Sequence, residues 1–344
     1  MIVSVQVLRA VAALMVVMHH IAIKGEQYHN GALGFFHVGQ FGVDLFFIIS
    51  GYIMCYTTDG KKCNFGQFIS RRFKRIIPLY WAITGVALII YIIAPSMVNS
   101  SGGETSIISS WTLFPLGKKL LVNNGWTLSY EFAFYFIFAA GLMFNSAGKR
   151  ILAVSLVLLC LVLLGFFFQP DNPSLKFITK FIMLEFILGM VAFYILKRMT
   201  LSRRVCFALL TLGILLLVIQ NETGVYQSVA GRLVSGGVPM FFIFSGFVGL
   251  EDFFKSSAFW GKDLLILIGE SSYSLYLVHA FTVAAGAVIA KKLHFAHHTW
   301  WFTLLLLSGS VIGGILCWRF VESPLNALFK AKGDKVPVKT AIAR

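Results

Sequence analysis

The sequence has little charge and few cysteines, and these shortages exclude several kinds of protein. Only 12% of its 344 residues are charged while 58% are hydrophobic, against roughly 25% and 45–50% in soluble domains. So many apolar side chains cannot all be buried in one soluble core, which excludes an ordinary soluble domain. The five cysteines have no paired spacing and no C-x-x-C pattern, so we expect neither a disulfide scaffold nor a metal site.

The charge that is present is mostly positive, with 29 Lys and Arg against 14 Asp and Glu and a formal net charge of +15. In a soluble protein such an excess would suggest binding to nucleic acid. Here the basic residues lie between long apolar runs, where membrane topology explains them. We therefore expect contact with membrane lipids and no nucleic-acid partner.

Apolar runs of about 20 residues can cross the hydrocarbon layer of a membrane as helices. Such runs predict an all-α polytopic integral membrane protein with about ten transmembrane helices. They lie at 3–23, 39–56, 76–94, 126–144, 151–168, 177–196, 205–219, 233–250, 264–290 and 301–321. The first run has no basic segment before it and no A-x-A cleavage pattern, so we expect a retained span and not a signal peptide.

The orientation follows from the basic residues in the connecting loops. Loops on one side of the predicted bundle carry more than twice as many Lys and Arg as loops on the other side. The positive-inside rule therefore predicts that both termini are cytoplasmic, which an even number of spans requires. We expect one transmembrane domain at 1–325 and a short basic cytoplasmic tail at 326–344.

Ionisable side chains inside the predicted spans are candidates for function, because a charge in lipid is costly. Arg9 and His20 lie eleven positions apart in the first span. That separation is about 20° past three full helical turns and roughly 16 Å along the axis, so we expect both side chains in one internal cavity. Asp44, Glu131 and His279 are predicted to share the outer half of the membrane with His20.

Simpler explanations remain open for these residues. Arg9 and His20 could be a structural pair satisfied by neighbouring helices. Asp44 and Glu131 could neutralise nearby cations. Glu185 is isolated in the sequence, and we interpret it as structural.

Four cations precede the third predicted span, in the run RRFKRIIP at 71–78. Arginine is well suited to bidentate contact with phosphate. We expect Arg71, Arg72 and Arg75 to hold a large anion at the inner face, with an extended arm directed toward Arg9 and His20. Positive-inside anchoring or binding of lipid headgroups is the alternative.

Six motifs, in order along the chain, resemble the acyltransferase 3 family of membrane acyltransferases. That family's signature of an Arg, ten residues and a His is matched at Arg9 and His20. The other five motifs are GVDLFFIISG at 42–51, RRFKRIIP at 71–78, WTLSYE at 126–131, SYSLYLVH at 272–279 and FVESP at 320–324. Together they cover almost the whole chain.

The resemblance implies transfer of an acyl group, usually acetyl, from cytoplasmic acyl-CoA (usually acetyl-CoA) to a glycan hydroxyl at or near the outer face. It implies that His20 is the catalytic base and that Arg9 is its partner in the donor channel. Histidine suits this role because its unperturbed pKa of about 6.5 lies near neutrality. The arginines expected to contact the coenzyme phosphates are Arg71, Arg72 and Arg75.

The remaining candidate residues are expected to serve the acceptor. Glu131 is a catalytic candidate that could orient the imidazole or hold sugar hydroxyls, and Asp44 could do either instead. The side chains expected to contact substrate are Asp44, Trp126, Ser274, Tyr276 and His279. No role for a metal is implied.

Two departures from the common family pattern narrow the resemblance. Thr127 stands where many members have Ser, and Phe132 stands where they have a second Glu, which is similar to the branch that acts on exopolysaccharides. We therefore expect a multi-pass protein of the bacterial cytoplasmic (inner) membrane. Its expected partners are a glycan or lipid-linked saccharide acceptor and the polysaccharide assembly machinery. Some members also carry a soluble hydrolase-like domain, for which this chain has no matching segment.

Two other classes of function remain open from the sequence. Intramembrane His, Glu and Asp also serve as proton relays, so a proton-coupled transporter or a flippase of a lipid-linked glycan is the main alternative. Inverted repeats and paired broken helices would favour a transporter, and we find neither in the sequence. A binding or sensory protein without turnover is the third possibility.

Overall fold

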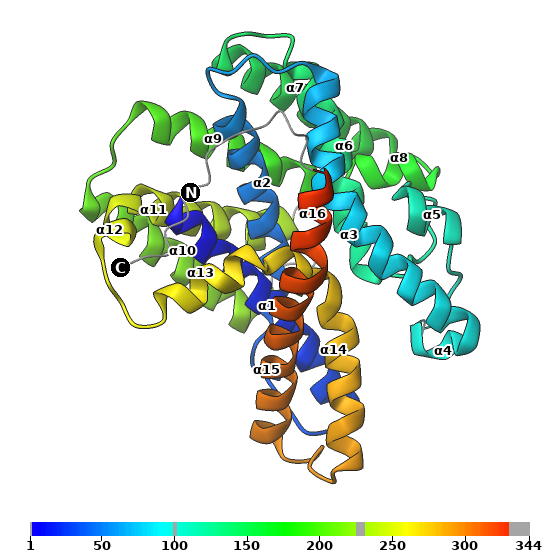
Figure 1. Cartoon of the computed structure of the whole chain (residues 1–344). Coiled ribbons are helices and arrows are strands. Elements are labelled where there is room, and N and C mark those ends of the chain that lie inside the picture. The colour runs from blue at the N-terminus through cyan, green and yellow to red at the C-terminus, as the bar shows by residue number, and fades with distance from the viewer. Residues whose placement is uncertain (1, 99–101, 225–230, 330–344) are drawn as a thin grey trace.

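The computed structural model describes residues 2–98, 102–224 and 231–329, which are almost entirely helical (Figure 1). Within these residues, 7 helices are long and apolar enough to cross a membrane. They are α1 (Val3–Gln27), α2 (Gly42–Thr58, extended by the turn Val38–Phe41), α3 (Phe65–Ile93), α7 (Ala147–Phe168), α10 (Arg203–Thr223), α14 (Ser272–Lys292) and α15 (Thr299–Cys317, continuing to Phe329). The structure confirms a polytopic helical membrane protein.

The other helices are shorter. They are α4 (Pro95–Val98), α5 (Ile107–Thr112), α6 (Trp126–Gly141), α8 (Pro173–Ile178), α9 (Leu184–Arg198), α11 (Val238–Gly249), α12 (Glu251–Ser256), α13 (Lys262–Glu270) and α16 (Ser323–Phe329). Three predicted spans correspond to α6, α9 and the apolar helix Leu233–Gly249. These three are shorter than the seven long helices, so a count of ten spans is not shown.

Two predicted boundaries were wrong. The helix α3 begins at Phe65, well before the predicted start at 76, so the cations of the 71–78 run lie within the helix itself. Asn64 explains this start, because its side chain accepts from the Gln67 amide while the Gln67 side chain accepts from the Asn64 amide. The predicted span 264–290 is divided into α13 and α14 at Ser271. Most of the predicted tail at 326–344 lies outside the described residues.

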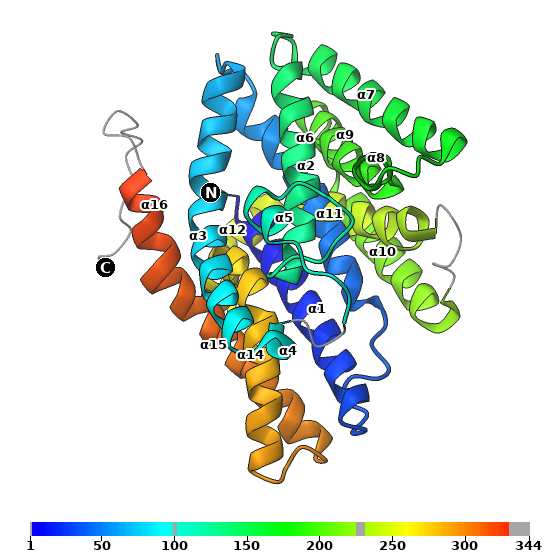
Figure 2. The ribbon, with the colours of Figure 1, turned by 90° about the vertical axis from the view of Figure 1, so that its right-hand side faces the viewer.

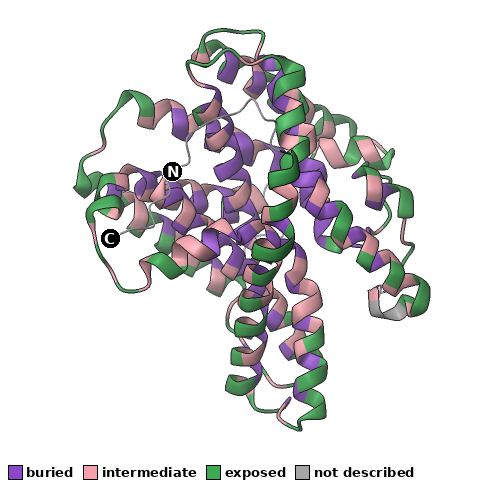
Figure 3. Ribbon diagram, viewed as in Figure 1, coloured by how far each residue is buried: buried purple, intermediate pink, exposed green. Residues whose placement is uncertain are grey.

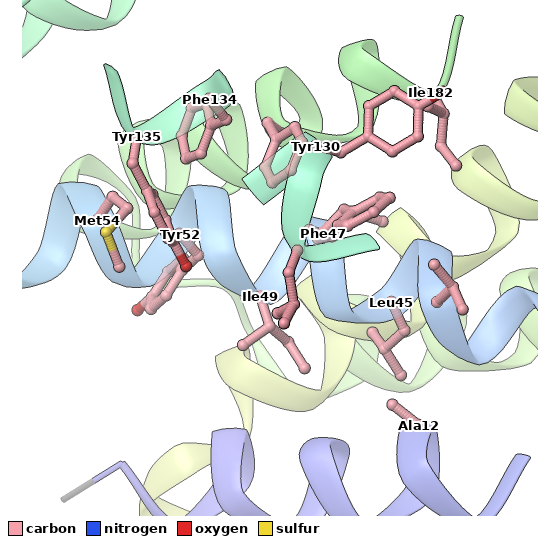
Figure 4. Close-up of a cluster of buried hydrophobic side chains, with 14 of the residues drawn as sticks. Ala12, Leu45, Phe47, Ile49, Tyr52, Met54, Tyr130, Phe134, Tyr135 and Ile182 are labelled. Carbon is pink, nitrogen blue, oxygen red and sulfur yellow. The ribbon is translucent and has the colours of Figure 1, made fainter. Parts of the chain in front are cut away.

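The helix α2 forms the centre of the bundle. In the most apolar 18-residue stretch of this helix, 83% of the residues are buried. The corresponding share is 22% in α7 and 17% in α10. Figure 4 shows α2 side chains such as Phe47 and Tyr52 packed beside Tyr130 and Phe134 of α6. The outward faces of the outer helices carry exposed apolar residues (Figure 3), as expected for lipid-facing surface.

The helix α1 is held in place by its neighbouring helices and by a carboxylate at its start. It packs against α2, α13 and α14, and α14 runs beside α15 in both views (Figures 1 and 2). The amides of Val3 and Ser4 donate to the Glu251 carboxylate at 2.9 and 2.8 Å. A carboxylate at this end satisfies free helix amides and favours the helix dipole, so Glu251 anchors the start of α1.

Two glycines allow α2 to pack directly against α9. A Cβ atom added to Gly189 would overlap the Ile48 carbonyl, and one added to Gly51 would overlap the Phe186 carbonyl. Both obstacles are backbone atoms, which cannot turn aside as a flexible side chain can. The small residues therefore set the distance between these helices, as is common in membrane bundles.

A charge cluster joins α2 and α9 to Arg232, the residue before the apolar helix Leu233–Gly249. Asp44 is 0% exposed and lies 2.7 Å from Nη2 of Arg232. Glu185 is also 0% exposed, and its carboxyl group interacts with both residues. Glu185 is isolated in the sequence but not in the fold, which brings it beside Asp44 and the Arg232 guanidinium.

We predict that Gly189→Ala destabilises the bundle, because overpacking typically costs about 1–3 kcal/mol. Thermal unfolding in detergent should show a lower midpoint than wild type. Gly309→Ala is the matched control, since Gly309 also lies in a helix but a Cβ there would meet no atom within 4 Å. Equal midpoints for the two variants would contradict a role for the close approach.

We predict that Arg232→Met destabilises the protein more strongly, because removing one partner of a buried ion pair costs about 3–5 kcal/mol. The yield of folded, monodisperse protein after gel filtration should fall. Adding Asp44→Asn and Glu185→Gln should restore much of the yield, because the triple variant leaves no unpaired charge. A single variant as stable as wild type would show that the ion pair contributes nothing.

Candidate active site

A cavity of about 170 Å³ opens between α1, α2, α3, α6 and α14. Its polar lining is dominated by charge, with the guanidinium groups of Arg9, Arg72 and Arg75 and the carboxylate of Glu131. The remaining lining residues are Val43, Phe46, Phe47, Ile49, Ser50, Ile53, Met54, Ile76, Thr127, Leu128, Tyr135, Ser272, Tyr273 and Tyr276. An excess of cations over anions with apolar walls suits a ligand that has both an anionic and an apolar part.

The first turns of α3 bring two of the three predicted arginines to this cavity. Arg72 and Arg75 line it, whereas Arg71 does not. The Arg72 guanidinium lies 5.6 Å from the centre of the Phe68 ring, while its Nε atom is buried without a partner. A buried donor without an acceptor is unusual in a protein interior, so Arg72 is ready to bind an anion.

Glu131 faces the same cavity as these cations. The Tyr135 hydroxyl donates to its Oε2 at 2.7 Å, and Ser50 Oγ lies 3.3 Å from that hydroxyl. We predicted that Glu131 lies in the outer half and the cations at the inner face. The structure corrects this separation, because the early start of α3 carries Arg72 and Arg75 to the level of Glu131.

Tyr276 forms the wall of the cavity on the α14 side. Thr127 Oγ1 donates to its hydroxyl at 3.0 Å, and the Asn124 side-chain amide donates to its backbone carbonyl at 3.1 Å. Three residues earlier on α14, the Tyr273 hydroxyl donates to the Ile76 carbonyl at 2.7 Å. These bonds tie α14 to α6 and α3 around the cavity.

His20 and His279 form a pair next to this wall. Nε2 of His279 lies 3.3 Å from Nδ1 of His20, and the ring centres are 4.7 Å apart. Nδ1 of His20 is 2.9 Å from the Val16 carbonyl, and Nδ1 of His279 is 2.7 Å from the Tyr276 carbonyl.

The hydrogen-bond partners of the pair assign its tautomers. A carbonyl only accepts, so Nδ1 carries the proton in both neutral rings. The single Nδ1 proton of His20 is then shared between the Val16 carbonyl at 2.9 Å and Nε2 of His279 at 3.3 Å. Nε2 of His20 keeps its lone pair, and no hydrogen bond within the described residues uses it. The arrangement leaves His20 with a basic nitrogen and a fixed ring.

His20 does not line the cavity that contains Arg9. Our prediction of one shared cavity was therefore wrong in this respect, although both residues lie on α1. Tyr276 links the two, because its ring lines the cavity while its carbonyl accepts from His279. The cavity and the histidine pair are neighbours across one turn of α14.

Three other predicted residues lie outside the cavity. Asp44 pairs with Arg232, and the Trp126 ring packs 5.8 Å from that of Tyr130. Ser274 donates to Glu322 at 2.6 Å. The Asp44 and Ser274 contacts join separate parts of the bundle, whereas Trp126 and Tyr130 both lie in α6. The expectation that all three contact substrate receives no support from the lining of the cavity.

The sequence interpretation missed several residues of the site. Tyr135 and Thr127 line the cavity and position Glu131 and Tyr276. Tyr135 lies four positions after Glu131, a spacing that places two side chains on one helix face, and this signal could have found it. Arg232 had no such signal, since it lies far from Asp44 in the chain. No group of three or more His, Cys, Asp or Glu in the described part of the chain could hold a metal ion.

The chain is similar to known proteins along most of its length. Residues 2–319 match a family model described as "Acyltransferase domain". The chain is 29% identical to the exopolysaccharide production protein ExoZ of Rhizobium meliloti, over 84% of this chain and 90% of that protein. It is 26% identical to the acyltransferase MdmB of Streptomyces mycarofaciens, over 97% of this chain and 93% of that protein.

A third relative is longer than this chain. The O-acetyltransferase OatA of Staphylococcus aureus is 23% identical over 98% of this chain, but the match covers only 59% of that protein. No solved structure matches the chain. Because the family model covers nearly the whole sequence, the chain belongs to the acyltransferase 3 family.

Proposed function

We propose that this protein transfers an acyl group, acetyl in the first instance, from cytoplasmic acyl-CoA to a hydroxyl of an exported or cell-surface glycan. The observation that carries the proposal is the cationic cavity of Arg9, Arg72 and Arg75, which reaches the histidine pair through Tyr276. Relatives named as an exopolysaccharide production protein and an O-acetyltransferase support the acceptor and the acyl group.

The donor fits the cavity through its charge and shape. Acyl-CoA has a phosphate-rich head and a long, narrow arm that ends in the thioester. Arg72 and Arg75 supply charge-assisted contacts for phosphate, and apolar walls such as Ile53 and Met54 suit the arm. Arg9, farther along the cavity on α1, is placed to stabilise the negative charge that develops on the thioester oxygen.

His20 supplies the proton transfer. Its Nε2 accepts the proton of the glycan hydroxyl while that oxygen forms a bond to the thioester carbon. The carbon–sulfur bond then breaks, and the proton passes to the departing thiolate, which leaves as free coenzyme A. General base catalysis of this kind typically contributes about 10²–10⁴-fold.

His279 acts as a positioning residue in this scheme. Its Nδ1 donates to the Tyr276 carbonyl, so its Nε2 shares with the Val16 carbonyl the Nδ1 proton of His20, and the two acceptors hold that ring in one orientation. In other catalytic histidines too, a neighbouring acceptor binds one ring nitrogen and thereby orients the other nitrogen. Glu131, bonded to Tyr135, offers a carboxylate to the donor side of the site.

The proposed topology places the termini and the donor cavity on the cytoplasmic side of a bacterial inner membrane. The seven long helices would then be joined by α6, α9 and the helix at 233–249 as shorter spans, which gives ten. The positive-inside excess of Lys and Arg supports this orientation.

We predict that His20→Ala abolishes acetyl transfer, with a loss of at least about 10²-fold in kcat, because no other group takes the hydroxyl proton. The assay is transfer of labelled acetyl from acetyl-CoA to glycan in inverted vesicles, with gel filtration as the check of folding. His297→Ala is the control, since His297 is exposed. Near-normal transfer by purified His20→Ala would show that the base is wrong.

We predict that Arg72→Ala and Arg75→Ala raise KM for acetyl-CoA by roughly tenfold each. A lost hydrogen bond to a charged group is worth about 1.5–3 kcal/mol, and about 1.4 kcal/mol corresponds to tenfold. Lys74→Ala lies on the same turn but outside the cavity, so its KM should stay close to wild type. An effect confined to KM for the glycan would contradict the donor assignment.

A further inference from the structure

A second cavity, of about 380 Å³, lies beside the histidine pair on the side away from the donor cavity. It is formed by the C-terminal half of α1, the segment before α2 and the end of α10. The lining residues are His19, Ala22, Ile23, Glu26, Gly34, Phe36, His37, Val38, Gln40, Phe41, Gln220, Asn221, Glu222, Thr223 and Gly224. We refer to it as the outer cavity.

The outer cavity is linked to the donor cavity by a row of rings. Tyr276 lines the donor cavity and its carbonyl accepts from His279, which lies 3.3 Å from His20. The ring of His20 is 5.4 Å from that of His19, which lines the outer cavity. His20 therefore stands in the partition between the two cavities, roughly 16 Å along α1 from Arg9.

The chemistry of the outer cavity differs from that of the donor cavity. Within the described residues, no Lys or Arg lines it, whereas three arginines line the donor cavity. Its polar groups are imidazole, amide and carboxylate, supplied by residues such as His37, Gln40 and Glu26. The carboxylates oppose binding of phosphate, while the amide and imidazole groups can donate to and accept from hydroxyls.

The apolar part of the outer cavity includes two aromatic rings. Phe36 and Phe41 line it beside the polar groups. Aromatic rings offer flat apolar faces that suit the C–H face of a sugar ring. Asn221 closes the wall, because its side chain accepts from the His37 amide at 2.9 Å and donates to the Phe35 carbonyl at 2.9 Å. The volume lies within the ~300–1,000 Å³ range of pockets for small ligands.

We propose that the outer cavity is the acceptor site and binds a hydroxyl-rich saccharide unit without phosphate. Gln40 would supply hydrogen bonds and Phe36 a stacking face, so that one sugar hydroxyl is presented to His20. The inference rests on the proposed transferase function, which it deepens by giving the acceptor a site separate from that of acyl-CoA.

The test compares Gln40→Ala and Phe36→Leu with matched controls. Gln27→Ala and Phe35→Leu remove the same side chains from exposed positions that do not line the cavity. The acceptor probe is surface polysaccharide from the producing strain, freed of ester groups with alkali. Binding of this polysaccharide to each purified protein is measured by calorimetry, and KM is measured for polysaccharide and for acetyl-CoA. Thermal midpoints establish that each variant is folded.

We expect Gln40→Ala and Phe36→Leu each to weaken polysaccharide binding and raise its KM by roughly fivefold, about the effect of one lost hydrogen bond. KM for acetyl-CoA should stay within about twofold of wild type, since these variants do not touch the donor cavity. Both controls should match wild type in every measurement.

The outcomes separate the two proposals. If the wild-type protein transfers acetyl but Gln40→Ala and Phe36→Leu bind polysaccharide as the controls do, the acceptor site is overturned and the transferase function stands. If the wild-type protein transfers nothing but binds polysaccharide in a manner that requires Gln40, the transferase function fails and the cavity is confirmed as a saccharide site. A rise in KM for acetyl-CoA alone would overturn the assignment of the cavity to the acceptor.

Discussion

The contact between His20 of α1 and His279 of α14 is the interaction on which the proposed chemistry depends. It joins two helices that are far apart in the chain, and the Val16 and Tyr276 carbonyls fix the proton positions in its two rings. It also places His20 beside the wall of the cationic cavity, although His20 does not line that cavity.

The surrounding bundle maintains this contact by satisfying polar groups that lipid cannot satisfy. Glu251 caps the start of α1, and Arg232 pairs with Asp44 at the end of α2 nearest to α1. The core of a bilayer contains no water that could hydrogen-bond such groups. The loss of a partner there therefore costs more free energy than at a water-exposed surface. The close approach of α2 and α9 at Gly51 and Gly189 then packs the rest of the core around them.

The proposed division into two cavities gives each substrate its own chemistry. The donor cavity carries the cations that an anionic coenzyme requires, and the outer cavity carries neutral and acidic groups that suit hydroxyls. A single site open from both sides would let water reach the thioester. A partition that holds the base lets two substrates from opposite sides of a membrane meet at one reacting centre.

Much of the fold and part of the site could be read from the sequence, because both depend on local patterns. Apolar runs of sufficient length predicted the seven long helices, since the thickness of the bilayer sets their length. The first apolar run placed Arg9 and His20 on one helix, and the RRFKRIIP run contains Arg72 and Arg75, which line the cavity. The depth of those arginines was missed because the Asn64 cap begins α3 earlier than hydropathy suggests.

What the sequence by itself determined is the helical membrane class, the family and the residue types available for catalysis. Only the tertiary structure decided which of them meet. Nothing in the chain near Asp44 indicates Arg232 or Glu185, because helix packing sets these contacts across long separations in sequence. The sequence placed His279 only in the same half of the membrane as His20, and packing decided that the two rings meet. The same packing brings Ser274 to Glu322 and leaves Arg71 outside the donor cavity. Periodicity specifies the face of one helix, whereas a site is formed by the faces of several.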